Sequence, residues 1–349
     1  MEPWIDYDLP KSLIAQEPLE NRADARLMVV RRESGAIEHR HVRDLPRLLD
    51  AGDRMVLNDT RVVPAQLRGR RESTGGNWQG LFLREHEEGG WRIVCKTRGQ
   101  LKPPEPVVLT DNDGRDAARL WLVERLEDGQ WLARSEGDAS TSDLLSLVGR
   151  VPLPPYIRDG AMVDDDVENY QTVFARHAGS VAAPTAGLHF TKRLLQEIAL
   201  KGVGFSAVTL HVGLGTFRPI AADDASEHVM HEEWARVTPA AAAELTATRA
   251  DGGRVVAVGT TVTRVLESVA AQSPASVYAA WEGQTDLYIT PPYEYAAIDA
   301  LMTNFHFPRT TLLLLVQALA GSELVRTAYD EAIREEYRFY SYGDAMLIL

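Results

Sequence analysis

The sequence predicts an α/β protein, with a large mixed α/β domain into which a small antiparallel β-barrel is inserted. Two observations support this prediction. Helical and strand-like patterns alternate over most of the second half of the chain, which is typical of a sheet flanked by helices. Between residues 62 and 150, short alternating runs are instead separated by Gly75-Gly76, Gly89-Gly90 and Asp128-Gly129, as in an antiparallel barrel. We therefore expect a discontinuous large domain, residues 1–61 and 151–349, and an inserted domain, residues 62–150.

The composition is that of a folded globular protein. A chain of 349 residues is long enough for two domains, and 45% hydrophobic with 25% charged residues lies near the globular average. The net charge of -13 argues against a nucleic-acid partner unless basic residues cluster locally. Cys95 is the only cysteine, which excludes an internal disulfide and a thiolate metal cluster.

Targeting and membrane signals are not expected from this sequence. The N-terminal residues are acidic and marked by prolines, without the apolar stretch of a signal peptide. The most apolar run, residues 312–316, is far shorter than the ~20 residues of a membrane span. We expect a cytoplasmic, monomeric protein with no membrane partner.

The first 61 residues predict a strand over 26–31, a hairpin at Ser34-Gly35, a helix over 43–50 and a strand over 54–57. The last strand ends in Asn58, Asp59, Thr60 and Arg61. Four polar residues directly after a buried strand indicate either an elaborate turn or a ligand-binding loop, and the pattern does not decide between them.

The inserted segment carries more basic than acidic side chains between Thr60 and Lys102, although the whole chain is acidic. A local basic patch can attract a polyanion, so phosphate binding is one interpretation. A solvated barrel surface is the other. A short helix over 142–148 and the prolyl segment 151–156 then lead back to the large domain.

The second half of the chain predicts the remaining elements from periodicity, caps and glycine or proline breaks. Thr191 is a plausible N-cap and Gly202 a plausible C′ residue of one helix. Val262, Val265, Leu266 and Val269 have the spacing of a core stripe on another. In chain order we expect a helix over 164–176, a helix over 191–202, a strand over 205–212, a helix over 239–250, a strand over 254–258, a helix after residue 261, a strand over 286–289, helices over 310–320 and 323–336, and a final strand over 341–348.

Two turns rich in glycine and threonine follow predicted strands. One contains Gly213, Gly215 and Thr216, and the other contains Gly259 and Thr260. Ligands in open α/β sheets bind outside the carboxyl ends of the strands, and glycine lets backbone N–H groups approach them. Neither turn is a dinucleotide or triphosphate motif, so a smaller nucleoside-like ligand is the remaining option.

Histidines gather in polar or glycine-rich contexts of the second half: His189, His211, His228, His231 and His306. His228 and His231 have an i, i+3 spacing that suits zinc on a helix, but no third ligand is placed by spacing, so we expect no metal. His211 shares one face of its strand with Phe205, Ala207 and Thr209, so a hydrogen-bonded core histidine is at least as compatible with the pattern as a catalytic one. No GxSxG motif is present, which leaves a serine hydrolase without support.

Taken together, several long stretches resemble the S-adenosylmethionine:tRNA ribosyltransferase-isomerase family of queuosine biosynthesis. They are YDLPKSLIAQEPLENRADARLMV, VLNDTRVVPAQLRGR, VPLPPYI, YQTVFARHAGSVAAPTAGLHFT, VTLHVGLGTFRPI, VVAVGTTVTRVLES, LMTNFHFPRTTLLLLVQALAG and YRFYSYGDAMLIL. They are ordered and spread over nearly the whole chain. The sequence departs from the family pattern in the barrel and at Thr290-Pro291-Pro292-Tyr293, where Pro292 cannot take the positive φ of a glycine turn.

The resemblance implies a fold and a reaction. The family fold is a large α/β domain with a small inserted barrel. Its members use S-adenosylmethionine as a consumed substrate, so no separate cofactor is expected. The ribosyl group passes to the aminomethyl group of 7-aminomethyl-7-deazaguanine at the wobble position of tRNA, which gives epoxyqueuosine and releases adenine and methionine.

This chemistry implies roles for residues in the matching stretches. The ribose carbon next to the sulfonium must lose a proton, adenine must gain one or a hydrogen bond, and imidazoles titrate in the useful range. The acid/base candidates are therefore His189, His211, His228, His231 and His306, with His211 the first choice as base because it adjoins the glycine turn. The candidates near the sulfonium are Asp59, Glu232, Asp344, Phe190 and Tyr342.

Other matching positions imply binding roles. Asn58, Thr185, Thr260 and Asn304 are candidates for the adenine and ribose edges. The further substrate-binding candidates are Thr60, Arg61, Gly187, Gly213, Gly215, Thr216 and Gly259. Arg61, Arg68 and Arg70 are candidates for tRNA phosphates.

Two interpretations from other classes remain open. The chain could be an acidic α/β enzyme acting on a small nucleoside-like metabolite, with the barrel as an oligomerisation module. It could also be a non-catalytic RNA-binding protein that uses the barrel like an OB-fold. The histidines and glycine turns outside the barrel favour catalysis, because an RNA-binding protein does not need them.

Overall fold

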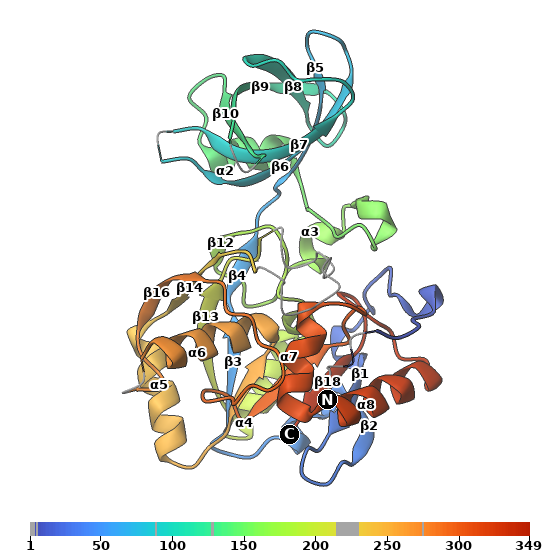
Figure 1. Cartoon of the computed structure of the whole chain (residues 1–349), viewed down its shortest axis with the longest axis vertical. Helices are drawn as coiled ribbons and strands as arrows, with labels where there is room; N and C mark the ends of the chain where they lie inside the picture. The colour runs from blue at the N-terminus through green and yellow to red at the C-terminus, as the bar shows by residue number, and fades with distance from the viewer. Residues whose placement is uncertain (1–3, 5, 88, 127–128, 214–229, 274–275) are drawn as a thin grey trace. The chain divides into compact units, whose positions relative to one another are not determined.

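The computed structural model describes residues 4, 6–87, 89–126, 129–213, 230–273 and 276–349. The chain divides into two compact units (Figure 1). The larger consists of Met1–Arg61, Tyr156–Arg158 and Glu168–Leu349, and the smaller of Val62–Pro155 and Asp159–Val167. The predicted α/β class with an inserted antiparallel barrel is confirmed.

Near residue 156 the chain passes from the smaller unit to the larger one, and hydrogen bonds attach residues 156 and 158 to the larger unit. Gln16 of the larger unit donates from Nε2 to the Tyr156 carbonyl at 2.9 Å and accepts the Arg158 N–H at 2.9 Å. In the smaller unit, the Val151 N–H lies 3.1 Å from the Met162 sulfur. The smaller unit therefore runs a few residues beyond position 150, and it also takes in residues 159–167.

A nine-stranded mixed sheet forms the centre of the larger unit, in the order β16-β14-β13-β3-β15-β17-β18-β1-β2. The strands are β1 (Arg26–Val30), β2 (Ile37–His41), β3 (Arg54–Asn58), β13 (Gly204–Leu210), β14 (Glu233–Val237), β15 (Val255–Val258), β16 (Trp281–Thr285), β17 (Ala300–Asn304) and β18 (Ala345–Ile348). β3, β13, β15 and β17 run parallel, so their carboxyl ends meet at one edge. β18 is antiparallel to β17 and therefore begins at that same edge.

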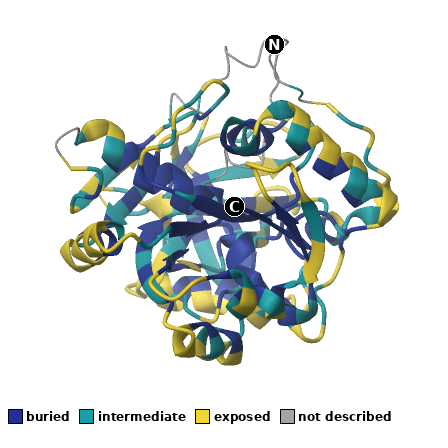
Figure 2. Cartoon of the chain, turned by 90° about the horizontal axis from the view of Figure 1, so that it is seen from below, coloured by how far each residue is buried: buried dark blue, intermediate teal, exposed yellow. Residues whose placement is uncertain are grey.

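Both faces of this sheet are buried (Figure 2). On one face Met28, Val56 and Ala257 pack with α5 (Pro239–Ala250), α6 (Thr260–Gln272), α7 (Thr311–Ala320) and α8 (Ser322–Arg334). On the other face Leu27 and Met55 pack with α1 (Leu45–Leu48) and α4 (Lys192–Leu200). Because successive side chains of a strand point to opposite faces, apolar residues at every position are what a central strand of such a sheet requires.

Threonine N-caps start three of the helices. Thr191 accepts the Leu194 N–H at 3.1 Å and starts α4, and Gly202 beyond its end has φ +90°. Thr238 and Thr310 cap α5 and α7 in the same way. The predicted apolar stripe of α6 is confirmed, since its four residues are at most 1% exposed. These caps satisfy N–H groups that the first turn of a helix leaves without a partner.

The smaller unit contains the barrel. Its strands are β5 (Gln66–Arg71), β6 (Asn77–Glu85), β7 (Trp91–Thr97), β8 (Glu105–Thr110), β9 (Asp116–Arg125), β10 (Trp131–Ser135) and β11 (Gly149–Arg150), in the order β11-β5-β6-β7-β10-β9-β8. β5 also pairs with β8, which closes the antiparallel sheet. α2 (Thr141–Val148) precedes β11, and its N-cap Ser140 accepts the Asp143 N–H at 3.1 Å. β4 (Thr60–Val62) and β12 (His177–Ser180) form a separate two-stranded sheet.

The helix expected over residues 164–176 is wrong, because only α3 (Asp166–Asn169) forms. Arg22 takes carbonyl groups that the continued helix would use. Its guanidinium donates to the Glu168 carbonyl and to the Gln171 carbonyl, each at 2.8 Å. Tyr170 is meanwhile buried to 1% exposure. Tertiary contacts therefore override the local helical pattern.

The strand expected over residues 286–289 is also wrong, because the strand is β16, immediately before it. Arg264 donates to the carbonyl groups of Thr285 and Leu287, which a neighbouring strand would otherwise use. The final strand is shorter than expected and begins at Ala345. β14 and β17 were not expected, since β14 buries a glutamate and β17 lies in a short run without turn signals at both ends.

Helix lengths bear on the expected absence of a membrane segment. In the described part of the chain no single helix is long and apolar enough to span a membrane. α7 and α8 reach that length only together, and they meet at a bend of 116°.

Candidate active site

A pocket lies at the sheet edge where β15 and β17 end. Five of the candidates from the sequence line it: Thr185, Gly259, Thr260, Asn304 and His306. They come from segments far apart in the chain, and the parallel strands bring them together. The pocket therefore lies where ligands of open α/β sheets bind.

The turn between β15 and α6 forms one wall of this pocket. Gly259 has φ +94°, and its N–H donates to the Met302 carbonyl at 2.7 Å. Residues with a side chain rarely adopt this conformation, so glycine allows the tight turn. Thr260 and Thr261 then begin α6, whose N-terminal end carries a partial positive charge that favours electronegative ligand atoms.

Aromatic rings form a second wall. The rings of Tyr156 and Tyr340 lie 4.9 Å apart, and Phe307 meets Tyr156 edge-on at 5.1 Å. The Tyr156 hydroxyl lies 2.6 Å from the Ser341 hydroxyl. Burial raises the pKa of both tyrosines above the ordinary value, so they stay neutral. Such rings suit stacking of a flat base or the approach of a cation to an aromatic face.

Asn304 supplies an acceptor beside these walls. Its Nδ2 donates to the Tyr340 carbonyl at 2.7 Å, and the residue is 3% exposed. Its Oδ1 is buried and has no hydrogen-bond partner among the described residues. Buried polar atoms are normally paired, so this oxygen indicates a place for a ligand donor.

His306 and His189 are both buried, and burial lowers their pKa to about 3 and about 4. His306 lines the pocket, with Nε2 2.9 Å from the Thr303 hydroxyl. His189 lines a second, neighbouring pocket. Two further effects act on His189: the Asn304 side chain raises its pKa, and the charges of Arg22 and Arg338 lower it. Both imidazoles are thus neutral at physiological pH.

His211, the first-choice base, does not line the pocket, although its neighbour Val212 does. Its Nδ1 lies 2.8 Å from the Thr60 hydroxyl, and its ring stacks on Trp234 with 4.8 Å between centroids. The pKa of His211 is lowered, mainly by burial and then by His177, while Asp59 opposes the shift.

His177, Trp234 and Arg236 surround His211 and were not among the candidates from the sequence. His177 Nε2 lies 3.6 Å from Asp59 Oδ2 and 3.1 Å from an Arg236 nitrogen. Single residues on short strands carry no motif, so no sequence signal identified them. They surround His211 with polar, charged and aromatic side chains.

Several candidates hold the fold together. Asn58 donates from Nδ2 to the Leu210 carbonyl at 3.1 Å, and its Oδ1 accepts the N–H groups of Thr60 and Leu210. Both Asp344 oxygens accept backbone N–H groups, from Arg26 and Arg338, at 2.8 Å. Asn58 Nδ2 also donates to the hydroxyl of Thr261, a pocket residue, at 3.2 Å. These two side chains are therefore held by hydrogen bonds within the fold.

Other candidates are placed as follows. Asp59 accepts the Thr209 hydroxyl at 2.7 Å. Phe190 is fully buried in the core on the α4 face, and Gly187 is buried where a Cβ would meet Phe174 and Thr172 within 3 Å. Tyr342 lines the second pocket. His231, Glu232, Arg61 and Arg68 are exposed, and Arg70 pairs with Asp116 at 2.5 Å. His228, Gly215 and Thr216 lie outside the described residues.

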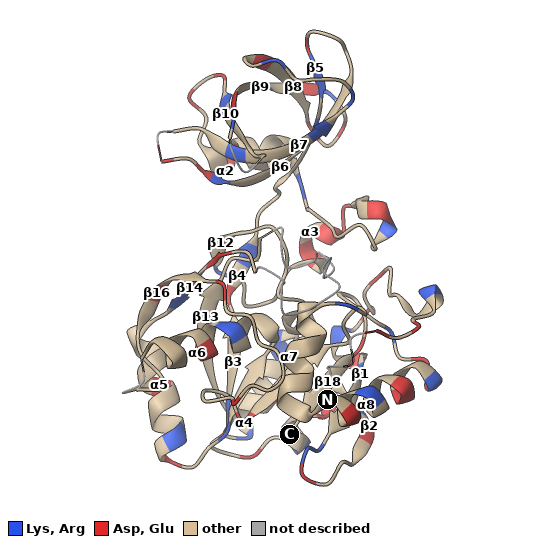
Figure 3. Cartoon of the chain, in the orientation of Figure 1, with Lys and Arg blue, Asp and Glu red and all other residues tan. Residues whose placement is uncertain are grey.

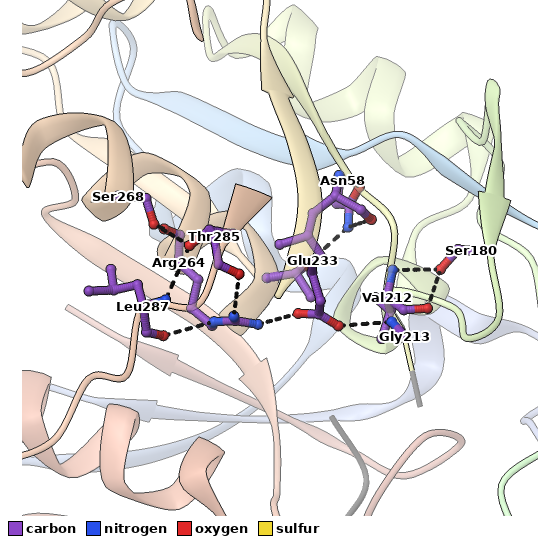
Figure 4. Close-up of polar contacts among 11 residues, drawn as sticks. Asn58, Ser180, Val212, Gly213, Glu233, Arg264, Ser268, Thr285 and Leu287 are labelled. Carbon is purple, nitrogen blue, oxygen red and sulfur yellow. Dashed lines mark hydrogen bonds and ion pairs between the residues drawn. The ribbon is translucent and has the colours of Figure 1, made fainter. Parts of the chain in front are cut away.

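Gly213 is held by a buried ion pair (Figure 4). Glu233 accepts its N–H at 2.8 Å and forms an ion pair with Arg264. Both charged side chains are 3% exposed. The pair thus fixes the end of the β13 segment next to His211.

The spacing of His228 and His231 suits a zinc ion, but His228 lies outside the described residues. Within the described ranges, no group of three or more histidine, cysteine, aspartate or glutamate side chains is placed to hold a metal ion. The structure therefore adds no support for a metal site there.

Comparison with known proteins extends over the whole chain. The model of a family described as queuosine biosynthesis protein matches residues 4–348. The chain is 49% identical over 345 residues to the S-adenosylmethionine:tRNA ribosyltransferase-isomerase of Symbiobacterium thermophilum, covering 99% of this chain and 98% of the relative. It is 48% identical over 350 residues to the protein of the same name from Cereibacter sphaeroides, with the same coverage. The crystal structure of an S-adenosylmethionine tRNA ribosyltransferase from Thermotoga maritima matches with a TM-score of 0.57 and 36% identity, over 99% of each chain.

Proposed function

The chain belongs to the family of queuosine biosynthesis proteins, and from this membership we propose that it is an S-adenosylmethionine:tRNA ribosyltransferase-isomerase. It modifies tRNA by moving the ribosyl part of S-adenosylmethionine to the aminomethyl group of 7-aminomethyl-7-deazaguanine at the wobble position. The products are epoxyqueuosine in the tRNA, free adenine and methionine. The full-length similarity is the single observation that carries this assignment.

The pocket at the sheet edge supports a place for the adenosine part of the substrate. Tyr156 and Phe307 offer faces for adenine or the sulfonium, and Asn304 Oδ1 offers an acceptor for the adenine amino group. The N-terminal turn of α6 favours the electronegative ring nitrogens or ribose hydroxyls. S-adenosylmethionine is consumed in the reaction, so the proposal includes no cofactor.

His211 remains the proposed base. A general base must be unprotonated before it acts, yet basic enough to accept the proton that it removes. It is therefore most efficient when its pKa lies near the working pH. His189 and His306 are neutral but weakly basic, with pKa values of about 4 and about 3. His211 is less buried than these two histidines. The nearby Asp59 carboxylate stabilises the protonated imidazole and so opposes the lowering of the His211 pKa. The attacking amine of the tRNA base must be neutral as well.

The tRNA would be bound as a loop from which the wobble base is splayed out. Basic and acidic residues are interspersed over the barrel strands (Figure 3), and Arg68 is exposed there. Arg61 is exposed on β4. Such side chains could contact phosphates of the stem without reading sequence.

The proposal is tested by product release. Purified chain is mixed with S-adenosylmethionine and with tRNA that carries either the aminomethyl-deazaguanine base or ordinary guanine. We expect adenine and methionine in equal amounts with the modified tRNA alone. Release without tRNA would favour an enzyme of small nucleoside-like metabolites, and tRNA binding without release would favour an RNA-binding protein. A monomeric state and a cytoplasmic location remain predictions.

A further inference from the structure

A second small pocket adjoins the first and contains charged groups that the proposed mechanism does not use. Arg22, Asn169, His189 and Tyr342 line it. Ser341 lines both pockets, and Asn304 of the first pocket acts on the pKa of His189 in the second. The two pockets are therefore adjacent in the fold.

Arg22 is fixed in this pocket without an acidic partner. Its guanidinium donates to the carbonyls of Glu168 and Gln171 at 2.8 Å and approaches the Asn169 side-chain oxygen at 3.4 Å. These are neutral acceptors, and within the described ranges no carboxylate pairs with it. Burial lowers the pKa of Arg22, which reflects the cost of keeping its charge there, while the charges of Tyr342 and Glu168 oppose the shift.

Arg338 brings a second guanidinium to the same region. Its Nη2 donates to the carbonyl of Glu17, the residue directly before the pocket residues Pro18 and Leu19. Its Nη1 is buried and has no hydrogen-bond partner in the part of the chain that the structure describes. Arg71 and Arg264, by contrast, each pair with a buried glutamate. A buried, unpaired guanidinium donor is costly unless a ligand satisfies it.

His189 adds a third unsatisfied group. The residue is 4% exposed, and its buried Nε2 makes no hydrogen bond of ordinary geometry with a described residue, although the Asn304 side chain lies close enough to raise the pKa of the ring. The charges of Arg22 and Arg338 both act on this ring. Two cationic side chains thus lie near a buried imidazole. The charges of Glu168 and Asp344 act on Arg22 and Arg338, but neither carboxylate forms an ion pair with a guanidinium nitrogen within the described ranges.

We propose that this second pocket, which Arg22 and His189 line and which Arg338 adjoins, is an oxyanion-binding subsite. The inference rests on the proposed function for the source of its ligand. The oxyanion is either the carboxylate of the methionyl part of S-adenosylmethionine or a phosphate of the tRNA. Guanidinium groups recognise both, because their N–H donors match two oxygens at once.

The variant Arg338→Met tests the subsite, because it removes the charge and keeps the aliphatic stem. Arg326→Met, on the exposed surface of α8, is the matched control. Calorimetry on the full chain measures binding of S-adenosylmethionine, of its decarboxylated analogue and of tRNA at several salt concentrations. Thermal melting checks that each variant is folded. Arg22→Lys is a second variant. It keeps a positive charge next to the Glu168 and Gln171 carbonyls but removes the paired N–H donors of the guanidinium.

Each source of the oxyanion predicts its own result. If the carboxylate binds here, Arg338→Met weakens S-adenosylmethionine binding by roughly 10- to 100-fold and leaves the decarboxylated analogue unchanged. If a phosphate binds here, tRNA binding weakens, its salt slope falls by about one, and S-adenosylmethionine binding is unchanged. Binding of both ligands within twofold of the wild type, in a folded variant, overturns the subsite.

Failure of the proposed function would look different. In that case the wild-type chain would bind neither substrate, and inorganic sulfate becomes the probe. A sulfate-dependent rise in Tm that Arg338→Met loses and Arg326→Met keeps would support the subsite alone. An equal rise in all three proteins would overturn it.

Discussion

The Nδ1 atom of His211 lies 2.8 Å from the hydroxyl oxygen of Thr60. Thr60 begins β4 just after β3 ends, and His211 directly follows β13, the parallel neighbour of β3. The hydrogen bond therefore fixes the ring of the proposed base at the sheet edge. Because Nδ1 is engaged, Nε2 is the nitrogen that remains for a proton transfer.

Removing the imidazole tests its role. We expect His211→Ala to lower kcat by roughly 10²- to 10⁴-fold, the usual contribution of a positioned general base. Thr60→Val should lower kcat about fivefold, the effect of one lost hydrogen bond of about 1 kcal/mol. Thr60→Ser keeps the hydroxyl and should stay near the wild type. Near-normal turnover of a folded His211→Ala variant would remove His211 from the mechanism.

The buried histidines predict a loss of stability in mild acid. The folded-state pKa values of His306 and His189, about 3 and about 4, lie below the ordinary value of 6.5. Below pH 6.5 the unfolded chain therefore takes up protons that the folded chain does not. Each histidine should lower the unfolding free energy by about 2 kcal/mol between pH 7 and pH 5.

Urea unfolding at the two pH values measures this loss. The variant His306→Gln cannot titrate, so its loss between pH 7 and pH 5 should be smaller than that of the wild type by about 2 kcal/mol. An identical loss in variant and wild type would mean that His306 is not kept neutral by the fold.

The buried pair of Glu233 and Arg264 predicts a large effect of single substitutions. Arg264→Met leaves the Glu233 carboxylate buried without its partner, which should cost roughly 3–5 kcal/mol of unfolding free energy. Arg193 and Glu197 form an exposed pair on α4, and Arg193→Met should cost less than about 1 kcal/mol. Urea unfolding compares the two variants. A similar small cost for both would contradict the role given to the buried pair.

Arg68 predicts an electrostatic contribution to tRNA binding. Arg68→Glu should raise the apparent KM for tRNA and flatten the salt dependence of binding, because fewer counterions are released. Arg326→Glu on α8 changes the net charge equally and serves as the control. Arg70 is less informative, since its guanidinium already pairs with Asp116. If the salt slope of Arg68→Glu equals that of the control, Arg68 does not contact a tRNA phosphate.

Much of the fold could be predicted from the sequence, because caps, glycine turns and apolar periodicity depend on neighbouring residues only. Thr191 and Gly202 bound α4 through a cap and a positive φ, both of which depend on a few neighbouring residues. The apolar stripe of α6 and the glycine-separated barrel strands are local in the same sense. Where a distant residue intervenes, the local pattern fails. Arg22 ends the helix near residue 169, about 150 positions away, by taking its carbonyls.

The site was predictable in part for the same reason. The glycine and threonine turn after a predicted strand indicated Thr260, whereas Asn304 was a candidate through the family resemblance because β17 was not expected. Both residues line the pocket. Whether such a residue faces the ligand or the fold depends on partners that the pattern does not contain. Both carboxylate oxygens of Asp344 accept backbone N–H groups. His177 lies near Asp59, although the two residues are 118 positions apart in the sequence. These pairings follow from the folded chain alone.

Transfer of the ribosyl group is the central claim, and isotopic labelling tests it most directly. S-adenosylmethionine labelled in its ribose carbons is incubated with the chain and with tRNA that carries the aminomethyl-deazaguanine base, and the digested tRNA is analysed by mass spectrometry. The account predicts that the whole labelled ribosyl unit appears on the wobble base, in the same amount as the adenine released. Unlabelled tRNA, recovered from a folded chain that binds both substrates, would contradict it.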